Sequence, residues 1–571
     1  MKVMKNILFL IVIFFSIVSV AQVTNEVEPR SWSMLEKSIV QPDVIVLPQV
    51  DIKSYLSEDI EDKENGQEKS LRIGADIEMN LNLFNDGKWS VLPNGDRLWK
   101  MNIKSVDAYF MRVIFDLYSI PEGAELFLYN NDRTDKIGPY TSSENSESGV
   151  LGTWIIQGDN LWLEYFEPAE VRGLGRLNIE KITHGYIDVY ESDKEVGDLN
   201  ESGACNVDVL CDPNRNSVGT KDWTNARNKL INSVGRLLIS SSRGTGFCSG
   251  SLVNNVTQDG TPYFLTANHC LGTDNNKQPN GVGAGYTNSV AFGFQWFTTT
   301  PDCATLIPTS GPEQPTRVIS GGVVKMNNDG SDTALFLMNQ RPPAAWDLFY
   351  AGWDNSTTDI PVVQLGMHHP SGDIMKLSRN DGISDRRFTE FNDNPTTQVW
   401  LIEDWDYGVT EGGSSGSLLL NENELIIGVL SGGSAACRGT SDNGGFDIYG
   451  RLDTNWSVGL TAAQRLRDWL DPNNTGATQL TGSYASTLTT SSLPTNFNDI
   501  NIFPNPSSGL FTIKTDLPIS YQIFNLNGQL INESTSDLSA SQLDLTAAAN
   551  GLYFVKITAG DQTVTRKVIK Q

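Results

Sequence analysis

The chain has 571 residues, of which 39% are hydrophobic and 19% charged, with 13 Trp, 16 Tyr and 23 Phe. It is too long for one domain and too rich in apolar side chains to be disordered throughout. Its 42 Lys and Arg against 68 Asp and Glu give a net charge of −26. That is the wrong sign for neutralising phosphates, so we expect no nucleic-acid partner.

The N-terminus has the pattern of an export signal. Lys2 and Lys5 precede an apolar run from Ile7 to Val20, and Ala21 supplies a small residue at its end. The run is shorter than the roughly 20 residues that cross a bilayer. We therefore predict a signal peptide over residues 1–21 and a secreted protein, extracellular or attached to the cell surface.

The next 180 residues or so divide into three parts. Residues 22–70 are acidic without a sustained period, which predicts an extended leader. Residues 71–190 hold short runs of β-branched and aromatic residues, such as Tyr109–Phe115, broken by turn signals, and this spacing predicts a β-sandwich. The acidic strip Glu191–Glu201 predicts a linker.

Residues 202–482 combine short strands with Gly-rich turns. One helix is predicted near their end, because Thr461 and Gln464 form a capping box and Pro472 follows as a stop. Residues 483–498 are rich in Ser and Thr, which predicts a spacer, and residues 499–571 alternate as in Gly551–Ile557, which predicts a third β unit.

All six Cys lie in the central region: Cys205, Cys211, Cys248, Cys270, Cys303 and Cys437. An even number in an exported chain predicts three disulfides, and the sequence alone leaves their connectivity open.

The scarcity of His narrows the search for a general base. The four His are His184, His269, His368 and His369. His269 follows the apolar run Tyr263–Leu265 and precedes Cys270, so a strand end and a cystine would hold its imidazole. His368 and His369 are adjacent, and adjacent side chains seldom converge on one metal ion, so we expect them to be structural.

A candidate nucleophile lies in Gly412-Gly413-Ser414-Ser415-Gly416-Ser417. A serine between glycines at a tight bend exposes its oxygen and aims backbone N–H groups at a developing oxyanion. With Ser414 as nucleophile the string also fits the α/β-hydrolase elbow, but in those enzymes a His follows the Ser, and no His lies beyond residue 369. The order left is His, acid, Ser, as in the chymotrypsin-type triad.

The acid of such a triad is expected at the head of a buried strand. Asp332 leads directly into the apolar run Ala334–Leu337, and Asp329 is the alternative three residues earlier. We predict Asp332, because the side chain nearest the buried run is the better desolvated one.

These residues together resemble the bacterial lysyl endopeptidases of the chymotrypsin-like serine protease group. The resemblance covers residues 202–482 and rests on ordered matches that include Ser202–Cys211, Cys248–Asn255, Thr266–Cys270, Phe349–Asp354, His368–Pro370, Gly408–Ser417 and Asp447–Arg451. It implies a mainly β fold with a double β-barrel, no metal or cofactor, and the triad His269, Asp332 and Ser415. It also implies oxyanion N–H groups from Gly413 and Ser415, and the disulfides Cys205–Cys437, Cys211–Cys303 and Cys248–Cys270.

The resemblance further implies where substrate binds. Asp447 matches the acid that pairs with the cationic side chain preceding the scissile bond, and Glu411 matches a second acid that shapes the site. The chain departs from the family at Ser431, which stands where the type member has a His, and near Phe391, where that member has a Trp. These departures leave cleavage after Arg as an alternative to strict Lys preference. Ser414 replaces the Asp of vertebrate-type enzymes, so activation should not require insertion of a new N-terminus.

The flanking regions carry resemblances of their own. Residues 22–201, with their sandwich, resemble the propeptide of secreted bacterial proteases, and Lys194 offers a site for self-maturation. Residues 499–571 resemble the C-terminal sorting domain of type IX secretion, which implies that machinery as a partner.

We therefore predict a secreted, monomeric serine endopeptidase without a cofactor, which cuts after Lys, or after Lys and Arg, in protein substrates. The alternatives are a surface adhesin that has kept the fold without turnover, and a serine protease of different primary specificity.

Overall fold

The structure is a computed structural model of the chain. It describes residues 27–35, 39–64, 70–189, 202–271, 285–301, 303, 315, 317–391, 394–438, 441–487 and 501–571, the last apart from 504, 506, 515–518, 526–528, 537–539 and 560–561. The predicted signal peptide, the acidic linker with Lys194 and most of the Ser/Thr-rich spacer lie outside these residues. No helix among the described residues is long and apolar enough to cross a membrane.

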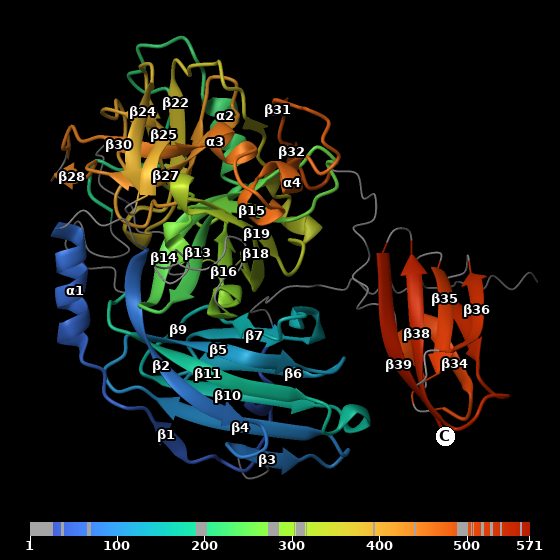
Figure 1. Cartoon of the computed structure of the whole chain (residues 1–571). Coiled ribbons are helices and arrows are strands. Elements are labelled where there is room, and N and C mark those ends of the chain that lie inside the picture. Colours follow the sequence, from blue (N-terminus) through green and yellow to red (C-terminus); the bar gives the residue numbers. More distant parts are fainter. Residues whose placement is uncertain are drawn as a thin grey trace, which may run out of the picture. The chain divides into compact units, whose positions relative to one another are not determined.

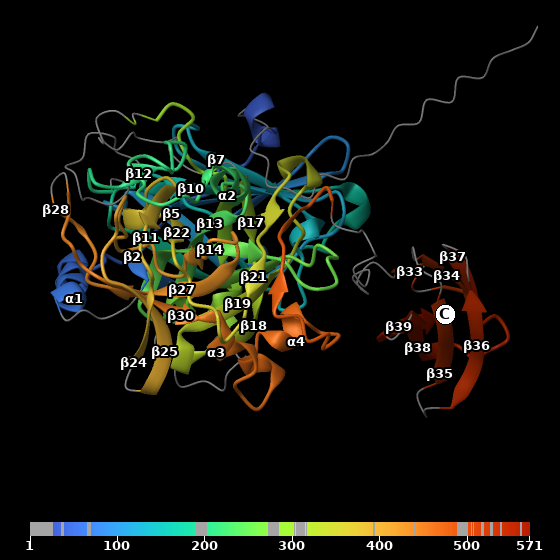
Figure 2. The same ribbon diagram turned by 90° about the horizontal axis from the view of Figure 1, so that it is seen from above.

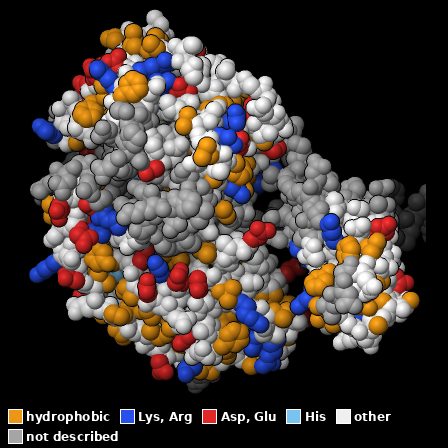
Figure 3. Space-filling model, in the orientation of Figure 1, with side chains coloured by type: hydrophobic (Ala, Val, Ile, Leu, Met, Phe, Trp, Pro, Cys, Tyr) orange, Lys and Arg blue, Asp and Glu red, His pale blue; other side chains and the backbone are white. Residues whose placement is uncertain are grey.

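The fold is mainly β, as predicted, and divides into two compact units, residues 1–488 and 489–571 (Figure 1). On the face in Figure 3, Lys and Arg side chains lie interspersed with Asp and Glu among the described residues.

The N-terminal part of the first unit is a sandwich of two sheets. One sheet has the order β1-β4-β10-β6-β7, with β3 on β4, and the other contains β2-β11-β5-β8, with β9 on β5. Apolar side chains from both sheets, such as Met101 and Val113, form one buried cluster between them. The strands are β1 Val44–Val46, β2 Leu71–Asn82, β3 Lys88–Val91, β4 Arg97–Lys104, β5 Phe110–Ser119, β6 Glu125–Asn130, β7 Lys136–Tyr140, β8 Leu151–Gly152, β9 Ile156–Gln157, β10 Asn160–Glu167 and β11 Arg176–Gly185.

Residues 202–482, which resemble the lysyl endopeptidases and are called the protease-like region, contain two groups of mostly antiparallel strands. The first comprises β13 Val234–Ser241, β14 Gly244–Val253, β15 Tyr263–Thr266, β16 Ala291–Phe294, β17 Arg317–Ser320, β18 Gly322–Asn328 and β19 Thr333–Met338. Through β14 this group shares a 12-stranded sheet with β2 of the sandwich. Both views place β13 and β14 side by side at the centre of the unit (Figures 1 and 2).

The second group has the order β12-β23-β22-β26-β27-β30-β25-β24. Its strands, with the short ones around them, are β12 Val207–Asp208, β20 Phe349–Tyr350, β21 Trp353–Asp354, β22 Gln364–His368, β23 Lys376–Asn380, β24 Asp385–Phe391, β25 Asn394–Ile402, β26 Leu418–Leu420, β27 Ile426–Gly433, β28 Cys437–Arg438, β29 Ser441–Asp442, β30 Asp447–Arg451, β31 Gln479–Leu480 and β32 Ser483–Tyr484. A single buried cluster includes residues of both groups, for example Leu265 and Leu418, so the two pack directly on each other.

The helices differ in two places from the expectations. The leader is not extended throughout, because α1 spans Ile52–Glu64. The helix predicted near Thr461–Leu470 is split into the 3-10 turn η11, Ala462–Gln464, and α4, Arg467–Leu470, since Arg465 between them is extended. The other two α-helices among the described residues are α2 Thr224–Leu230 and α3 Leu452–Trp456.

Three disulfides join Cys205–Cys437, Cys211–Cys303 and Cys248–Cys270, the pairs that the family resemblance implies. The first two connect segments that are 232 and 92 residues apart in sequence. They tie the start of the protease-like region to segments that are distant in sequence.

The second unit contains two small antiparallel sheets, β33-β34-β37 and β36-β35-β38-β39. A buried apolar cluster contains side chains from both sheets, for example Phe511 and Val555. The strands are β33 Asn501–Phe503, β34 Leu510–Lys514, β35 Ile519–Asn525, β36 Leu530–Ser536, β37 Ala540–Asp544, β38 Gly551–Ala559 and β39 Gln562–Lys570.

Candidate active site

His269 and Asp332 lie together because the strands that carry them are neighbours. His269 opens the 3-10 turn η5, His269–Leu271, just after β15, and Asp332 directly precedes β19. β15 and β19 pair antiparallel. The imidazole Nδ1 lies 2.7 Å from Asp332 Oδ2, and the backbone N–H of His269 donates to Oδ1 at 2.8 Å. The carboxylate therefore holds a proton on Nδ1 and leaves Nε2 as the basic nitrogen.

The alternative acid, Asp329, has a different contact. Its Oδ1 accepts a hydrogen bond from the Asn268 side chain at 3.3 Å. Asp332 is 0% exposed and adopts a left-handed backbone conformation with φ of 50°. Of the two candidates, Asp332 is thus the one on the imidazole.

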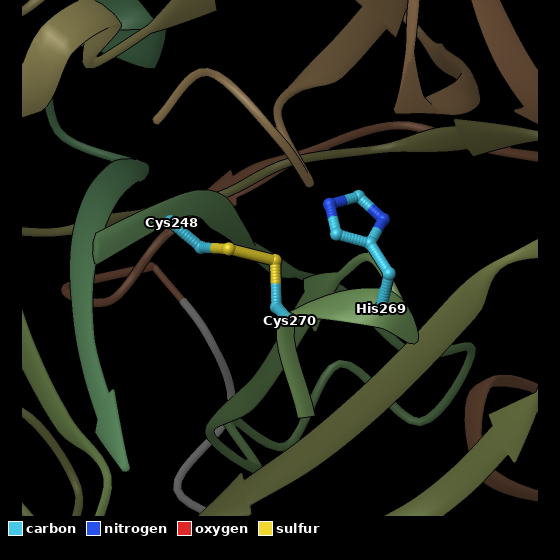
Figure 4. Close-up of side chains that lie close together, drawn as sticks. All are labelled: Cys248, His269 and Cys270. Atoms are coloured by element: carbon cyan, nitrogen blue, oxygen red, sulfur yellow. A yellow bond between two sulfur atoms is a disulfide. The ribbon is translucent and has the colours of Figure 1, made fainter. Parts of the chain in front are cut away.

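A disulfide lies beside His269. The sulfurs of Cys248 and Cys270 and a ring nitrogen of His269 lie within 4.8 Å of one another, a spacing that could suggest a metal site (Figure 4). The two sulfurs are bonded to each other, so neither is a thiolate that could bind a metal. The bond instead fixes the residue next to His269 onto β14.

Three serines follow the glycines of the candidate nucleophile turn, and only one is accessible. Ser414 and Ser417 are 0% exposed, whereas Ser415 is partly exposed. Gly413 and Gly416 have φ of 92° and 83°, values that favour glycine. The turn therefore leaves Ser415 partly accessible and buries Ser414 and Ser417.

The backbone N–H groups of the turn fall into two sets, those bonded to carbonyls of the chain and those that are not. Those of Ser414, Gly416 and Ser417 donate to carbonyls of the chain. Within the described part of the chain, the N–H groups of Gly413 and Ser415 have no such acceptor. Two N–H donors left open beside an accessible serine are the arrangement that stabilises an oxyanion.

The serine turn is attached to the strand group that carries His269. The Ser249 N–H donates to the Ser415 carbonyl at 2.8 Å, and Ser249 Oγ donates to the Gly413 carbonyl at 2.9 Å. A Cβ on Gly416 would overlap Thr266 Oγ1, so only glycine allows this approach. Thr266 ends the strand that leads to His269, so the two halves of the site meet here.

His368 contacts this turn directly, and His369 contacts Ser249, which binds the turn. His368 Nδ1 lies 2.8 Å from Ser414 Oγ, and the His369 N–H donates to Ser249 Oγ at 2.9 Å. The His369 ring stacks on Trp296, with ring centroids 5.9 Å apart. Burial, helped by nearby cations, lowers the pKa of each imidazole to about 3, so both are neutral.

Asp447 is a buried carboxylate at the start of β30, opposite Gly433 on β27. It is 2% exposed, and its Oδ2 accepts hydrogen bonds from Trp405 Nε1 at 2.7 Å and Thr410 Oγ1 at 2.6 Å. Burial raises the pKa of Asp447 to about 6, against the opposite effect of these two bonds. Both bonds end on Oδ2, so among the described contacts Oδ1 is left for another donor.

Sequence reasoning missed Trp405. Thr410 fell within a motif quoted for the family resemblance, but Trp405 lies outside every such motif, and nothing local connects it with a residue 42 positions later. Phe391, near the place expected for the family's Trp, ends β24, and its side chain is not among those described.

Glu411 has a different environment from Asp447. Its Oε2 accepts hydrogen bonds from the Gly203 N–H and the Asn206 side chain, both at 3.0 Å, and from Ser371 Oγ at 3.3 Å. The carboxylate thus attaches the beginning of the protease-like region to the serine turn.

Parts of this chain are similar in sequence to known proteins. Residues 199–450 match the family model of the lysyl endopeptidase C-terminal domain. This region is similar to the lysyl endopeptidase family. The lysyl endopeptidase of Pseudomonas aeruginosa is 28% identical over 364 residues, which cover 61% of this chain and 72% of that protein. The match includes residues beyond the protease-like region, and it makes the chain a serine endopeptidase, as predicted.

The second unit also has a match. Residues 501–571 fit the model of the secretion system C-terminal sorting domain. The predicted location is thereby confirmed, and the lysyl endopeptidase-like chain is a secreted or cell-surface protein.

The similarity to solved structures is weaker than the similarity to the Pseudomonas aeruginosa enzyme. The protease Rv3671c of Mycobacterium tuberculosis, in its inactive Ser343Ala form, is 13% identical with a TM-score of 0.25, covering 41% of this chain and 90% of that one. A Glu endopeptidase is 15% identical with a TM-score of 0.21, covering 39% and 86%.

Proposed function

We propose that this lysyl endopeptidase-like protein cuts peptide bonds on the carboxyl side of Lys through a triad of His269, Asp332 and Ser415. The observation that carries the proposal is the Asp332 carboxylate on both the Nδ1 and the backbone N–H of His269. An acid in that place fixes the tautomer of the imidazole and stabilises the imidazolium.

The reaction follows from these positions. His269 Nε2 takes the proton of Ser415 Oγ as the oxygen attacks the peptide carbonyl carbon, and the carbonyl oxygen becomes an oxyanion at the N–H groups of Gly413 and Ser415. His269 then gives the proton to the departing amine, which leaves an acyl-enzyme. Water, deprotonated by His269, releases the acid and restores the serine.

Asp447 is the proposed determinant of specificity. Its carboxylate is held by Trp405 and Thr410 and is otherwise desolvated. A substrate ammonium would supply the missing charge partner, whereas a neutral side chain would leave the buried carboxylate uncompensated. Arg carries the same charge in a different shape, and Ser431 at the family's His place leaves room for its acceptance.

The flanking regions complete the proposal. Residues 22–201 act as a pro-region, and the sorting domain directs export through the type IX secretion machinery. The mature enzyme acts on proteins as a monomer and without a cofactor.

The triad is tested by covalent labelling with a phosphonofluoridate, which reacts with an activated serine. We expect one label per matured enzyme molecule, located on Ser415 by mass spectrometry, and strongly slowed labelling in Asp332→Asn. A label on Ser414, or equal rates in the wild type and Asp332→Asn, would contradict the triad.

A further inference from the structure

The loop that carries the proposed oxyanion donors begins with a tight turn over residues 411–414. The Ser414 N–H donates to the Glu411 carbonyl at 3.0 Å, and Gly413 has a φ of 92°. A left-handed residue in the third place is the geometry of a type II turn. In a type I turn that residue has a negative φ, and the central peptide is turned over by about half a rotation. Because both central residues, Gly412 and Gly413, are glycines, either form is sterically open to the turn.

The two forms of the turn differ in where the Gly413 N–H points. In a trans peptide the carbonyl and the N–H point in opposite directions. The Gly412 carbonyl accepts a hydrogen bond from the Ser371 N–H at 2.6 Å, so the Gly413 N–H points away from Ser371. Turning this peptide over would put a carbonyl oxygen where a developing oxyanion needs a donor.

Ser371 belongs to a turn that packs against Gly413. This 3-10 turn, η10, spans Pro370–Gly372 and follows β22. A Cβ on Gly413 would lie 3.0 Å from the His369 carbonyl oxygen and 3.1 Å from the Gly372 nitrogen. The two segments are therefore in contact, and the place of η10 determines the place of the peptide between Gly412 and Gly413.

Ser371 has a backbone conformation that residues with a side chain seldom adopt. Its φ is 52° and its ψ is 24°, which is the left-handed region. Such a conformation costs free energy and persists only where the surrounding structure enforces it. Because φ describes rotation about the N–Cα bond, a change in φ would turn the Ser371 N–H relative to Gly372, which packs on Gly413.

Three contacts hold η10 in this conformation. Arg236, which is 0% exposed, donates from Nη1 to the Gly372 carbonyl. Ser371 Oγ donates to Glu411 Oε2 at 3.3 Å, and the Asp373 N–H donates to the carbonyl of the first residue of η10 at 2.8 Å. Two of the three partners lie far from η10 in sequence. The fold around the turn, and not the turn alone, thus enforces the left-handed residue.

We propose that Ser371 is a positioning residue of the oxyanion hole, and that its backbone N–H keeps the peptide between Gly412 and Gly413 in the orientation that aims the Gly413 N–H at the oxyanion. This rests on the proposed function and adds to it a residue outside the triad. The role belongs to the backbone of Ser371, and its hydroxyl is one of the supports of the turn.

The proposal separates substrate binding from catalysis. The substrate cation binds at Asp447 in either orientation of the peptide, whereas the Gly413 N–H acts most strongly when negative charge develops on the carbonyl oxygen. A change that frees the peptide should therefore lower kcat and leave KM nearly unchanged. Loss of one oxyanion donor lowers kcat by about 10²–10³-fold, which sets the largest effect expected.

The first test measures kcat and KM on a lysyl amide for the matured enzyme and three variants at residue 371. Ser371→Val and Ser371→Thr bring in β-branched side chains that oppose a positive φ, whereas Ser371→Gly accepts it. We expect kcat to fall by about 10- to 100-fold in Ser371→Val, with a smaller fall in Ser371→Thr. Ser371→Gly should have a kcat at least about tenfold above that of Ser371→Val, because it keeps both the N–H and the left-handed backbone.

The variants also separate the backbone from the hydroxyl, which Ser371→Thr keeps and Ser371→Gly lacks. A kcat that follows the hydroxyl, high in Ser371→Thr and low in Ser371→Gly, would overturn the proposal. So would a folded Ser371→Val with the kcat of the wild type. Ser371→Thr carries the same comparison with Ser371→Gly if Ser371→Val does not fold.

Asn474→Val is the matched control. Asn474 has a φ of 50° and is exposed in the loop after α4, so the change imposes the same kind of backbone strain outside η10 and the serine turn. Its kcat should equal that of the wild type. Equal losses of kcat in Asn474→Val and Ser371→Val would overturn the proposal, because the loss would then reflect strain in general.

The second test compares two inhibitors on the wild type and Ser371→Val. The cation n-butylammonium has the charge of a Lys side chain and no carbonyl group, whereas a peptide aldehyde ending in lysinal forms a hemiacetal with Ser415 whose oxygen lies at the oxyanion position. We expect the Ki of the aldehyde to rise by about the factor by which kcat falls, and that of n-butylammonium to stay within about twofold. Equal rises for both inhibitors, or an unchanged Ki of the aldehyde, would overturn the proposal.

Failure of this inference differs from failure of the proposed function. If the matured enzyme cuts after Lys but Ser371→Val and Ser371→Thr keep the kcat of the wild type, the inference fails and the function stands. If the matured enzyme does not cut after Lys at all, the proposed function fails first.

Discussion

His269 and Asp332 share two hydrogen bonds, from the imidazole Nδ1–H to Oδ2 at 2.7 Å and from the backbone N–H to Oδ1 at 2.8 Å. The carboxylate is 0% exposed. One acid thus sets both the position and the tautomer of the candidate base, because the ring cannot rotate without breaking the first bond and the backbone cannot shift without breaking the second.

Asp332→Asn should lower kcat by about 10³–10⁴-fold while the fold persists, because an amide stabilises the wrong tautomer and cannot compensate the imidazolium. Steady-state kinetics on a lysyl amide, together with a thermal unfolding curve, measures both effects. Asp329→Asn is the matched control, and its kcat should stay within a factor of a few. Equal losses in the two variants would contradict the assignment.

Ser415→Ala and Ser414→Ala should separate the two adjacent hydroxyls. Removing the hydroxyl of the partly exposed Ser415 should abolish turnover, since it removes the nucleophile. Removing that of Ser414 breaks its contact with His368 and should cost about 1 kcal/mol of unfolding free energy, with activity retained. Kinetics and chemical denaturation of both variants test this, and an active Ser415→Ala would refute it.

Asp447 should give the enzyme an acidic limb near pH 6, because burial raises its pKa to about 6. Below that pH the carboxyl is protonated in the free enzyme, so kcat/KM for lysyl substrates should fall. Asp447→Asn should lose most activity on lysyl substrates at every pH. The role of Asp447 in binding the substrate cation would be contradicted if kcat/KM of the wild type showed no titration near pH 6 that is absent from this variant.

The same shift has a consequence for stability. A carboxyl whose pKa is raised on folding binds more protons in the native state, so the unfolding free energy decreases as pH rises from about 4 through about 6. Asp447→Asn removes this dependence. The unfolding free energy of the variant minus that of the wild type should therefore be higher at pH 7 than at pH 4, on the order of 2 kcal/mol. Denaturation of both proteins at pH 4 and pH 7 measures it, and a variant that loses relative stability on going to pH 7 would contradict the shift.

Replacing Cys248 and Cys270 together with Ser should lower the unfolding free energy by about 3 kcal/mol, since the bond closes a loop of sequence separation 22. It should also lower kcat, because Cys270 holds the turn that begins at His269. Replacing Cys211 and Cys303 is the control, expected to reduce stability without the same loss of kcat. Denaturation and kinetics of both double variants test this, and equal kcat losses would argue against a positioning role.

Much of the site could be predicted because its signals are local. The order of His269 and Ser415 along the chain excluded the hypothesis of an α/β-hydrolase. The apolar strand after Asp332 indicated that the Asp332 side chain is desolvated. The mainly β class followed from short alternating segments. These features depend on a few neighbouring residues, which a sequence shows directly.

The rest depends on contacts between distant segments. The addition of β2 to β14 joins Leu71 to Phe247, and no local pattern encodes that pairing. Helix α1 was missed because its apolar residues Leu56 and Ile60 are exposed, at 38% and 60%, and ion pairs with Arg72 hold it instead.

The most direct test of the account is a digest of a denatured protein mixture with the matured enzyme, its Ser415→Ala variant and its Asp447→Asn variant, with every new terminus identified by mass spectrometry. We predict cuts after Lys, or after Lys and Arg, that vanish in Ser415→Ala and collapse in Asp447→Asn. Cuts that persist in Ser415→Ala, or cuts after neutral residues that Asp447→Asn leaves unchanged, would contradict the account.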